Sequence, residues 1–332
     1  MGNATSRSNC FNIIRFLAAL QVFLGHAAGH LNVELPQLPM KLLFVVQGVP
    51  VFFLISGFLI WTSLNRENNL KAFVRKRILR IYPELWGGVV LSAIVIIVLY
   101  SDHIKWNRFI PWIATQSTVL QFWTPDCLRG YGCGTPNGSL WTIGVMVQCY
   151  VVMWLLHRFL HGKGIGRWSF ILTVGIICNI LTPYSGNVMP VIISKLFGQT
   201  FVPYIWIFVL GALISEKFES WKSVLTSYWW IFLSVSAIAT FTGLDVGSYG
   251  TFKVLTLAPA VIGFAYKYPA LNVKYDISYG FYIYHMIVIN FLIECGYTGK
   301  VIYIFMACGL SIILAVVSYF TMGMIYRKQK HK

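Results

Sequence analysis

Ten apolar runs, most of them about 20 residues long, divide this chain of 332 residues. Roughly 20 consecutive apolar residues let a helix cross the hydrocarbon core of a bilayer. Only 11% of the residues are charged, whereas a soluble domain carries about 25%, so an ordinary soluble enzyme is excluded. We expect an all-α, polytopic membrane protein rather than a membrane β-barrel, because the runs do not alternate. The predicted spans are 11–31, 42–63, 84–101, 140–158, 168–184, 200–216, 228–243, 251–266, 277–294 and 300–326.

The basic residues lie mainly between these runs and predict the orientation. An even number of spans puts both termini on one side, and that side then holds 19 of the 26 Lys and Arg. Loops on the cytoplasmic side are rich in Lys and Arg, so we expect both termini to be cytoplasmic. The net charge of +16 would indicate nucleic acid as the partner of a soluble protein, but here we interpret it as topology.

Three segments outside the spans belong to the predicted single domain of residues 1–332. The first, residues 64–83, is too polar to cross lipid but has helical spacing and should lie at the cytoplasmic surface. The second is an outer loop, residues 102–139, whose Trp, Gly and Pro suit a re-entrant piece or a lid that faces substrate. It contains Cys127 and Cys133, which are either thiols or a disulfide. The third is a cytoplasmic tail, residues 327–332. We expect no cleaved signal peptide, because no small-residue cleavage site follows the first run.

Arg15 and His26 are the most unusual residues of the first span. They are eleven positions apart, which is about 20° past three full helical turns, so they share a face and lie about 16 Å apart along the axis. Arginine within a span snorkels to lipid phosphate or faces a polar cavity, and a buried histidine can simply be a hydrogen-bonded core residue. Their shared face favours a central polar cavity.

A basic cluster follows the second span. In segment 64–83 the residues Ala72, Val74, Ile78, Leu79 and Ile81 could cover one face and leave Arg75, Lys76, Arg77 and Arg80 near the membrane surface. Arg77 and Arg80 share a face, and guanidinium pairs bind phosphate oxygens bidentately. The cluster therefore binds either a charged phosphate donor from the cytosol or lipid headgroups.

Two other spans carry unusual residues. The second span contains GVPVFFLISGFLI (residues 48–60), where small residues such as Ser56 and Gly57 permit either close helix packing or a kink that opens space for a ligand. The ninth contains His285, too far along the span to belong to an interfacial aromatic belt. The chain has neither a CxxC pair nor an HExxH motif, so we predict no metal site.

These pieces, in this order, resemble the acyltransferase-3 family of integral membrane acyltransferases. The resemblance rests on Arg15 followed by ten residues and His26, on GVPVFFLISGFLI, on FVRKRILRIYP with Arg77 and Arg80, and on ISYGFYIYH ending at His285. It extends from the first span to at least the ninth. It implies a stand-alone O-acetylase of the bacterial inner membrane that moves acetyl from acetyl-CoA to a sugar of a cell-surface polysaccharide, such as O-antigen of lipopolysaccharide.

The resemblance also implies roles for individual residues. Arg77 and Arg80 would hold the CoA phosphates, with Arg75 and Lys76 as weaker helpers and Arg15 at the entry. His26 would be the general base, since the pKa of histidine lies near neutrality, and His285 a second acid/base or an orienting group. Trp141, Tyr150 and Ser56 are candidate substrate contacts, although core packing is the stronger explanation for Trp141 and Tyr150, and close helix packing is the alternative for Ser56. The partners would be membrane lipid, acetyl-CoA and a glycan or lipid-linked sugar, with no nucleic acid.

One position departs from the family pattern. The fourth-span motif of the family reads roughly W-S-L-x-x-E-x-x-F-Y, and here Met146 stands at the glutamate and Cys149 at the phenylalanine. Methionine neither accepts a proton nor binds a cation, and Gln148 lies about 200° further around the helix. The role of the glutamate is therefore dispensable, or the chain is a catalytically impaired member.

A different class of function also fits intramembrane Arg and His, namely a transporter or flippase of an acyl or glycosyl metabolite. The sequence shows no inverted repeat and no pair of matching broken spans, which are typical of many transporters.

Overall fold

The computed structural model describes residues 8–67 and 69–324, and within these ranges the chain is helical without strands. The prediction of an all-α membrane protein is confirmed. The predicted tail at 327–332 lies outside the described residues. The α-helices are α1 (Phe11–His30), α2 (Gln37–Leu43), α3 (Gly48–Arg66), α4 (Leu70–Tyr100), α5 (Trp106–Gln116), α6 (Trp141–Leu160), α7 (Ile165–Leu181), α8 (Val191–Phe197), α9 (Ile205–Glu216), α10 (Phe218–Thr242), α11 (Thr251–Lys267), α12 (Ser278–Glu294) and α13 (Val301–Phe320).

Seven runs within the described residues are long and apolar enough to cross a membrane. Each corresponds to a predicted span, and the runs are Phe11–His30, Gln37–Arg66, Leu70–His103, Gly138–Leu160, Ile165–Asn187, Phe218–Thr242 and Val301–Phe320. The other three predicted spans are also helices, but α9 has 12 residues and α11 and α12 have 17 each. The chain is therefore polytopic, and the count of ten stays a prediction.

The helices form two compact units, and the boundaries between them fall within α1, α2 and α6 as well as in loops. The first unit comprises residues up to 18, 38–67 and 148–276. The second comprises residues 19–37, 69–147 and 277 onward.

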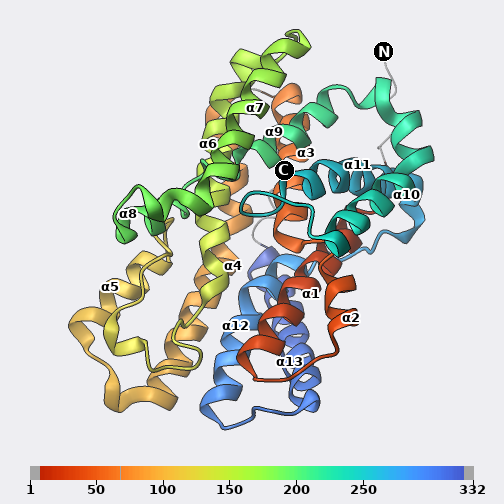
Figure 1. The fold of residues 1–332 in the computed structure, drawn as a ribbon. Coiled ribbons are helices and arrows are strands. Elements are labelled where there is room, and N and C mark those ends of the chain that lie inside the picture. Colours follow the sequence, from red (N-terminus) through yellow and green to blue (C-terminus); the bar gives the residue numbers. More distant parts are fainter. Residues whose placement is uncertain (1–7, 68, 325–332) are drawn as a thin grey trace. The chain divides into compact units, whose positions relative to one another are not determined.

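Glycines set the closest helix packing in the first unit. α3 packs against α9, and a Cβ atom at Gly57 would collide with the backbone carbonyl of Phe208, as one at Gly211 would with that of Leu54. α10 and α11 form a second adjacent pair, which Figure 1 shows side by side. Small residues let helix backbones approach closely. The predicted alternative of close packing at Gly57 therefore describes this part of the run 48–60.

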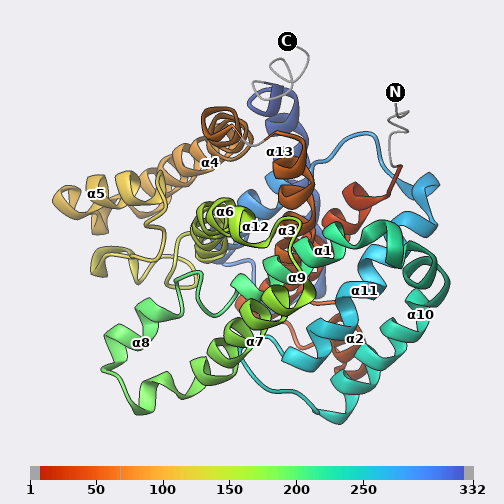
Figure 2. The ribbon, with the colours of Figure 1, turned by 90° about the horizontal axis from the view of Figure 1, so that it is seen from above.

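The second unit is built around α12, which packs against α13 and α4. Figures 1 and 2 both show α12 and α13 as neighbours. Tyr279 Oη donates to the carbonyl of Ile81 at 2.9 Å. Further along, a Cβ atom at Gly88 of α4 would collide with Ile283 of α12. Because these contacts follow the same order on both helices, α4 and α12 run parallel.

The helix α4 differs from the predicted arrangement of the basic segment. Residues 64–66 end α3, whereas residues 70–83 form one continuous helix with the predicted span 84–101, and Pro83 does not interrupt it. The 31 residues of α4 measure about 46 Å, which exceeds the hydrocarbon core of about 30 Å. The basic residues therefore lie on an extension of a spanning helix.

Candidate active site

A pair of histidines joins α1 to α12 in the second unit. Nδ1 of His26 on α1 and Nε2 of His285 on α12 are 3.0 Å apart, and the two rings stack with their centroids 5.3 Å apart. His285 is fully buried. Phe23 packs edge-on against both Phe281 and His285 and closes one side of the pair. The structure thus brings together the two histidines that were predicted separately from the sequence.

The hydrogen bonds of His285 determine the protonation pattern of the pair. Its Nδ1 lies 2.7 Å from the backbone carbonyl oxygen of Tyr282, and a carbonyl can only accept, so Nδ1 carries the proton. In the neutral ring Nε2 is then an acceptor, and the donor facing it is Nδ1–H of His26. A neutral His26 with its proton on Nδ1 has its lone pair on Nε2, which is the requirement for a general base.

A third histidine, His30, lies one turn beyond His26, and the two ring centroids are 5.7 Å apart. It was not among the predicted site residues. The i, i+4 spacing of His26 and His30 on one helix was the sequence signal that identifies it.

The two faces of α4 separate the predicted basic cluster. Arg77 and Arg80 are half-buried and lie on the same face as the buried residues Phe73 and Ile81. The guanidinium carbon of Arg77 lies 5.4 Å from the centre of the Phe73 ring. Arg77 and Arg80 therefore belong to the inward face of α4, in the same unit as the histidine pair.

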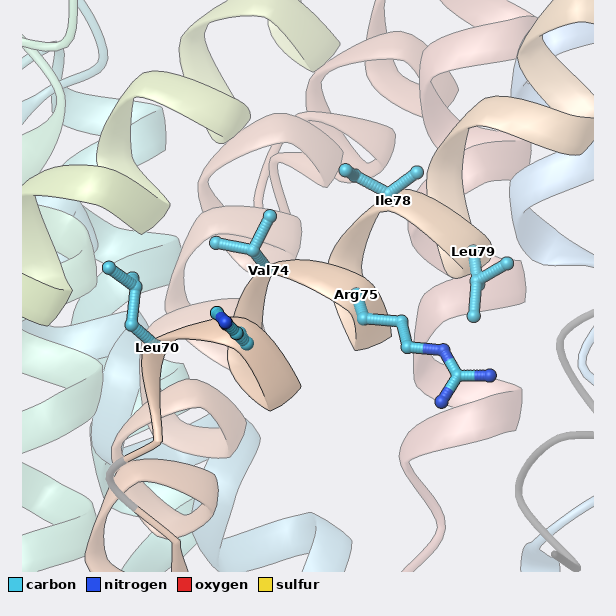
Figure 3. Close-up of a pocket in the computed structure, with 6 residues that line it drawn as sticks. Leu70, Val74, Arg75, Ile78 and Leu79 are labelled. Carbon is cyan, nitrogen blue, oxygen red and sulfur yellow. The ribbon is translucent and has the colours of Figure 1, made fainter.

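Arg75 and Lys76, in contrast, are exposed. Arg75 borders an open pocket of about 420 Å³ on the opposite face of α4, lined by Leu70, Lys71, Val74, Arg75, Ile78 and Leu79 (Figure 3). Val74 and Ile78, two of the residues predicted to cover one face of this segment, are 42% and 45% exposed. Their stripe continues at four-residue spacing through the exposed Trp86, Val90 and Ile94, as expected for the side of a spanning helix that faces lipid.

Glu84, at the start of the predicted span 84–101, is a carboxylate that the sequence analysis missed. Its Oε2 accepts a hydrogen bond of 3.4 Å from Ser318 of α13, and Ser318 Oγ accepts one of 3.2 Å from Tyr284 of α12. Glu84 is half-buried. An acidic residue at the start of a predicted span was the available signal, because ionisable residues within spans are rare and usually functional.

The first unit holds three other predicted residues, Arg15, Ser56 and Tyr150. Arg15 forms an ion pair of 3.2 Å with Asp276, and the two side chains are 11% and 22% exposed. Ser56 is half-buried on α3, and Tyr150 is buried with its ring 6.1 Å from that of Phe208. The pair of Arg15 with Asp276 is a contact that the sequence did not predict.

The fourth-span motif has a half-buried Trp141 at the first residue of α6 and a half-buried Met146 one turn further on. The amide of Gln148 is occupied by backbone: it donates to the carbonyl of Gln199 at 3.2 Å and accepts from the N–H of Phe201 at 3.0 Å. Gln148 is therefore an anchor for that segment and does not take the place of the glutamate that Met146 replaces.

Cys127 and Cys133 are both free thiols in the structure. The loop that contains them has its own small hydrophobic core, formed by Phe109, Trp112, Leu128 and Tyr131 with Ala93 and Ile96 of α4. Burial raises the pKa of the Tyr131 hydroxyl and of the Cys133 thiol.

The half-buried His26, the fully buried His285 and the half-buried Arg77 and Arg80 thus lie in one helical unit. Residues 8–320 match the family of the acyltransferase domain. The chain therefore belongs to the acyltransferase-3 family of membrane acyltransferases, and it is an integral membrane protein.

Named relatives agree with this assignment. The chain is 28% identical over 324 residues to Nodulation protein 10 of Rhizobium leguminosarum bv. viciae, covering 90% of this chain and 87% of that protein. It is 26% identical over 316 residues to the O-acetyl transferase of Shigella phage Sf6, covering 86% and 87%. A shorter match, 28% identical over 135 residues, relates it to the acyltransferase MdmB of Streptomyces mycarofaciens, covering 38% and 34%. No solved structure gives a significant match.

Proposed function

We propose that the protein transfers acetyl from acetyl-CoA to a hydroxyl of a cell-surface polysaccharide or lipid-linked sugar, such as O-antigen. The observation that carries this proposal is the pairing of His26 Nδ1 with His285 Nε2 at 3.0 Å, with His285 held by the Tyr282 carbonyl. The similarity to a phage O-acetyl transferase supports acetyl as the acyl group and oxygen as the acceptor atom.

In the proposed reaction, Nε2 of His26 removes the proton of the acceptor hydroxyl while the oxygen attacks the thioester carbonyl. The tetrahedral intermediate collapses, the carbon–sulfur bond breaks, and the CoA thiolate takes the proton from His26. The products are the O-acetyl ester and free CoA thiol, so that His26 is neutral again. A base in this role contributes about 10²–10⁴-fold to the rate.

Arg77 and Arg80 are the proposed binding site for the phosphates of CoA. Guanidiniums suit this role because they bind phosphate oxygens bidentately. Glu84, one turn beyond Arg80, lies level with Gly280 of α12, because a Cβ atom at Gly280 would be 3.1 Å from the Glu84 carboxylate. Since α4 and α12 run parallel, Arg80 and His285 are about 14 Å apart along the helix axes, a separation that the pantetheine arm of CoA can bridge.

The proposed setting is a bacterial inner membrane with both termini cytoplasmic. Acetyl-CoA then reaches Arg77 and Arg80 from the cytosol, and the glycan reaches the histidine pair from the other side. The excess of Lys and Arg in the loops on the side of the termini supports this orientation.

The function is tested on the product in cells. Surface glycan from cells that express the wild-type protein should gain the mass of one acetyl group per modified sugar, and glycan from cells that express His26→Ala should not. Unmodified glycan in both strains, with the wild-type protein present in the membrane, would refute an O-acetyltransferase of surface glycans.

Met146, which stands at the position of the family's glutamate, favours a second hypothesis, in which the chain is a catalytically impaired member of the family. Met146→Glu in the same assay distinguishes the two hypotheses. If the wild-type protein is a competent enzyme, the variant gains little; a gain of tenfold or more in transfer would show that the wild-type chain is impaired.

A further inference from the structure

The segment Gly132–Thr142, which we call the strap, runs along α12 from its last residue to its second turn. The N–H groups of Gly132 and Cys133 donate to the side chains of Glu294 and Asn290. At its other end the strap reaches Tyr282. Glu294 and Tyr282 are twelve residues apart on α12, about 18 Å of helix. The strap therefore reaches the level of the histidine pair.

Asn290 of α12 holds the N-terminal half of the strap. Its Oδ1 accepts from the N–H of Cys133 at 2.8 Å, and its Nδ2 donates to the carbonyls of Thr135 and Pro136 at 3.0 and 2.9 Å. The side chain is fully buried. Displacing a buried amide that makes these three hydrogen bonds costs free energy, because the loss of one partner leaves a buried polar group without a hydrogen bond.

The C-terminal half of the strap forms hydrogen bonds with the turn of α12 that also holds His285. Asn137 Nδ2 donates to the carbonyl of Ile283 at 3.0 Å. The Ser139 hydroxyl lies 2.8 Å from Asn137 Oδ1 and 3.3 Å from the carbonyl oxygen of Tyr282. That carbonyl also accepts the Nδ1–H of His285. One carbonyl thus links the strap to the imidazole whose proton it fixes.

Thr142 completes this group from the first turn of α6. Its hydroxyl lies 2.9 Å from the Tyr282 hydroxyl and 3.0 Å from the carbonyl of Ser139. Asn137, Ser139, Thr142 and Tyr282 are at most 5% exposed. Such a fully bonded buried network has one favoured arrangement, since any partial rearrangement leaves polar atoms without partners.

We propose that Asn137 and Ser139 are positioning residues for the histidine pair. They hold the turn Tyr282–Ile283, so that the Tyr282 carbonyl keeps the proton of His285 on Nδ1 and the proton of His26 on its own Nδ1. The hydrogen bond made by one ring nitrogen determines the role of the other. The strap thereby keeps Nε2 of His26 as the base. This role rests on the proposed function, but the proton position on His285 can be measured without substrate.

The kinetic test uses Asn137→Asp, which removes the donor to Ile283, and Ser139→Ala, which removes the hydroxyl. We expect kcat for acetyl transfer to fall by about 10–100-fold in each, the range seen when outer partners of a ligating histidine are removed. The KM for acetyl-CoA should stay unchanged. The matched control is Thr135→Val in the same strap, because the Thr135 hydroxyl makes no hydrogen bond to the residues that the structure describes.

The second test measures the protonated nitrogen of His285 by NMR of ¹⁵N-histidine-labelled protein in nanodiscs. The chain has seven histidines, and His285→Gln identifies the signal. In wild-type protein and in Thr135→Val, His285 should be protonated on Nδ1. In Ser139→Ala and in Asn137→Asp, His285 should be a mixture of the two tautomers. A single Nδ1–H signal in every variant would overturn the positioning role, as would kcat within twofold of wild type in both strap variants.

If wild-type protein transfers no acetyl group, the proposed function fails while the NMR result still decides the positioning role. A variant that does not fold is recognised by a lost thermal transition, and the other strap variant then provides the test.

Discussion

At the residue scale, chemistry depends on which nitrogen of each histidine carries a proton. The sequence predicts His26 and His285 as separate candidates, because an ionisable residue within a span stands out in a single chain. Their contact at 3.0 Å is not predictable in this way, since 259 residues separate the two rings along the chain. The same holds for the pair of Arg15 with Asp276.

Replacing each histidine with alanine should have unequal effects. His26→Ala removes the base and should lower kcat by about 10²–10⁴-fold. His285→Ala leaves the base in place, but nothing then keeps the proton of His26 on Nδ1. We therefore expect a smaller decrease in kcat, of about 10–100-fold. The measurement is the initial rate of acetyl transfer at saturating acetyl-CoA. A larger loss of kcat in His285→Ala than in His26→Ala would contradict the assignment of His26 as the general base.

The reactivity of the Cys133 thiol tests whether Cys133 is buried in the loop 102–139. Because burial raises its pKa, less of it is thiolate at neutral pH than in an exposed cysteine, and only the thiolate reacts. Maleimide should therefore label the exposed Cys295 first, and the rate for Cys133 should increase as the pH is raised. The measurement is mass spectrometry of peptides over time. Equal rates at neutral pH would contradict the burial of Cys133, and labelling only after reduction would indicate a disulfide.

At the element scale, each helix presents one face to the protein and another to lipid, and α4 shows how this sorts the basic residues. The composition of segment 64–83 predicts a helix and a phosphate-binding cluster. It does not predict which face is inward, because apolar residues occur on both the buried face and the lipid-facing one in a membrane protein. Phe73 and Ile81 face inward with Arg77 and Arg80, while Val74 and Ile78 face outward.

The two faces predict different effects for neighbouring arginines. Arg77→Gln and Arg80→Gln should each raise the KM for acetyl-CoA about tenfold or more, because a hydrogen bond to a charged group is worth about 1.5–3 kcal/mol. Arg75→Gln is the matched control and should leave the KM within about twofold. The measurement is the dependence of the initial rate on acetyl-CoA concentration. An equal rise in all three variants would mean that the cluster acts only through its total charge.

Glycine contacts between α3 and α9 make a prediction about stability. A Cβ atom at Gly57 meets the backbone of Phe208, whereas one at Gly309 of α13 meets nothing within 4 Å. We expect Gly57→Ala to lower the free energy of unfolding by about 1–3 kcal/mol, as overpacking does, and Gly309→Ala to leave it unchanged or raise it slightly. Thermal unfolding in detergent, followed by circular dichroism, measures both. Identical transitions would show that α3 and α9 can separate at no cost.

At the scale of the whole molecule, hydrophobic run length predicts the fold class well. The predicted spans recur as helices, since a run of apolar residues in a membrane has no alternative that satisfies its backbone. The helix lengths are less predictable: α9, α11 and α12 are shorter than the runs that meet the length for a span. The strap and the contact of Glu84 with Ser318 depend on tertiary packing, which no pattern within one segment encodes.

The most direct measurement of the central claim is acetyl transfer by purified protein in proteoliposomes. The assay supplies labelled acetyl-CoA and a lipid-linked glycan and compares wild type with His26→Ala. Wild-type protein should label the glycan, and His26→Ala should do so at least about 100-fold more slowly while keeping the same thermal transition. Equal labelling by the two proteins would remove His26 from the reaction and contradict the proposed mechanism.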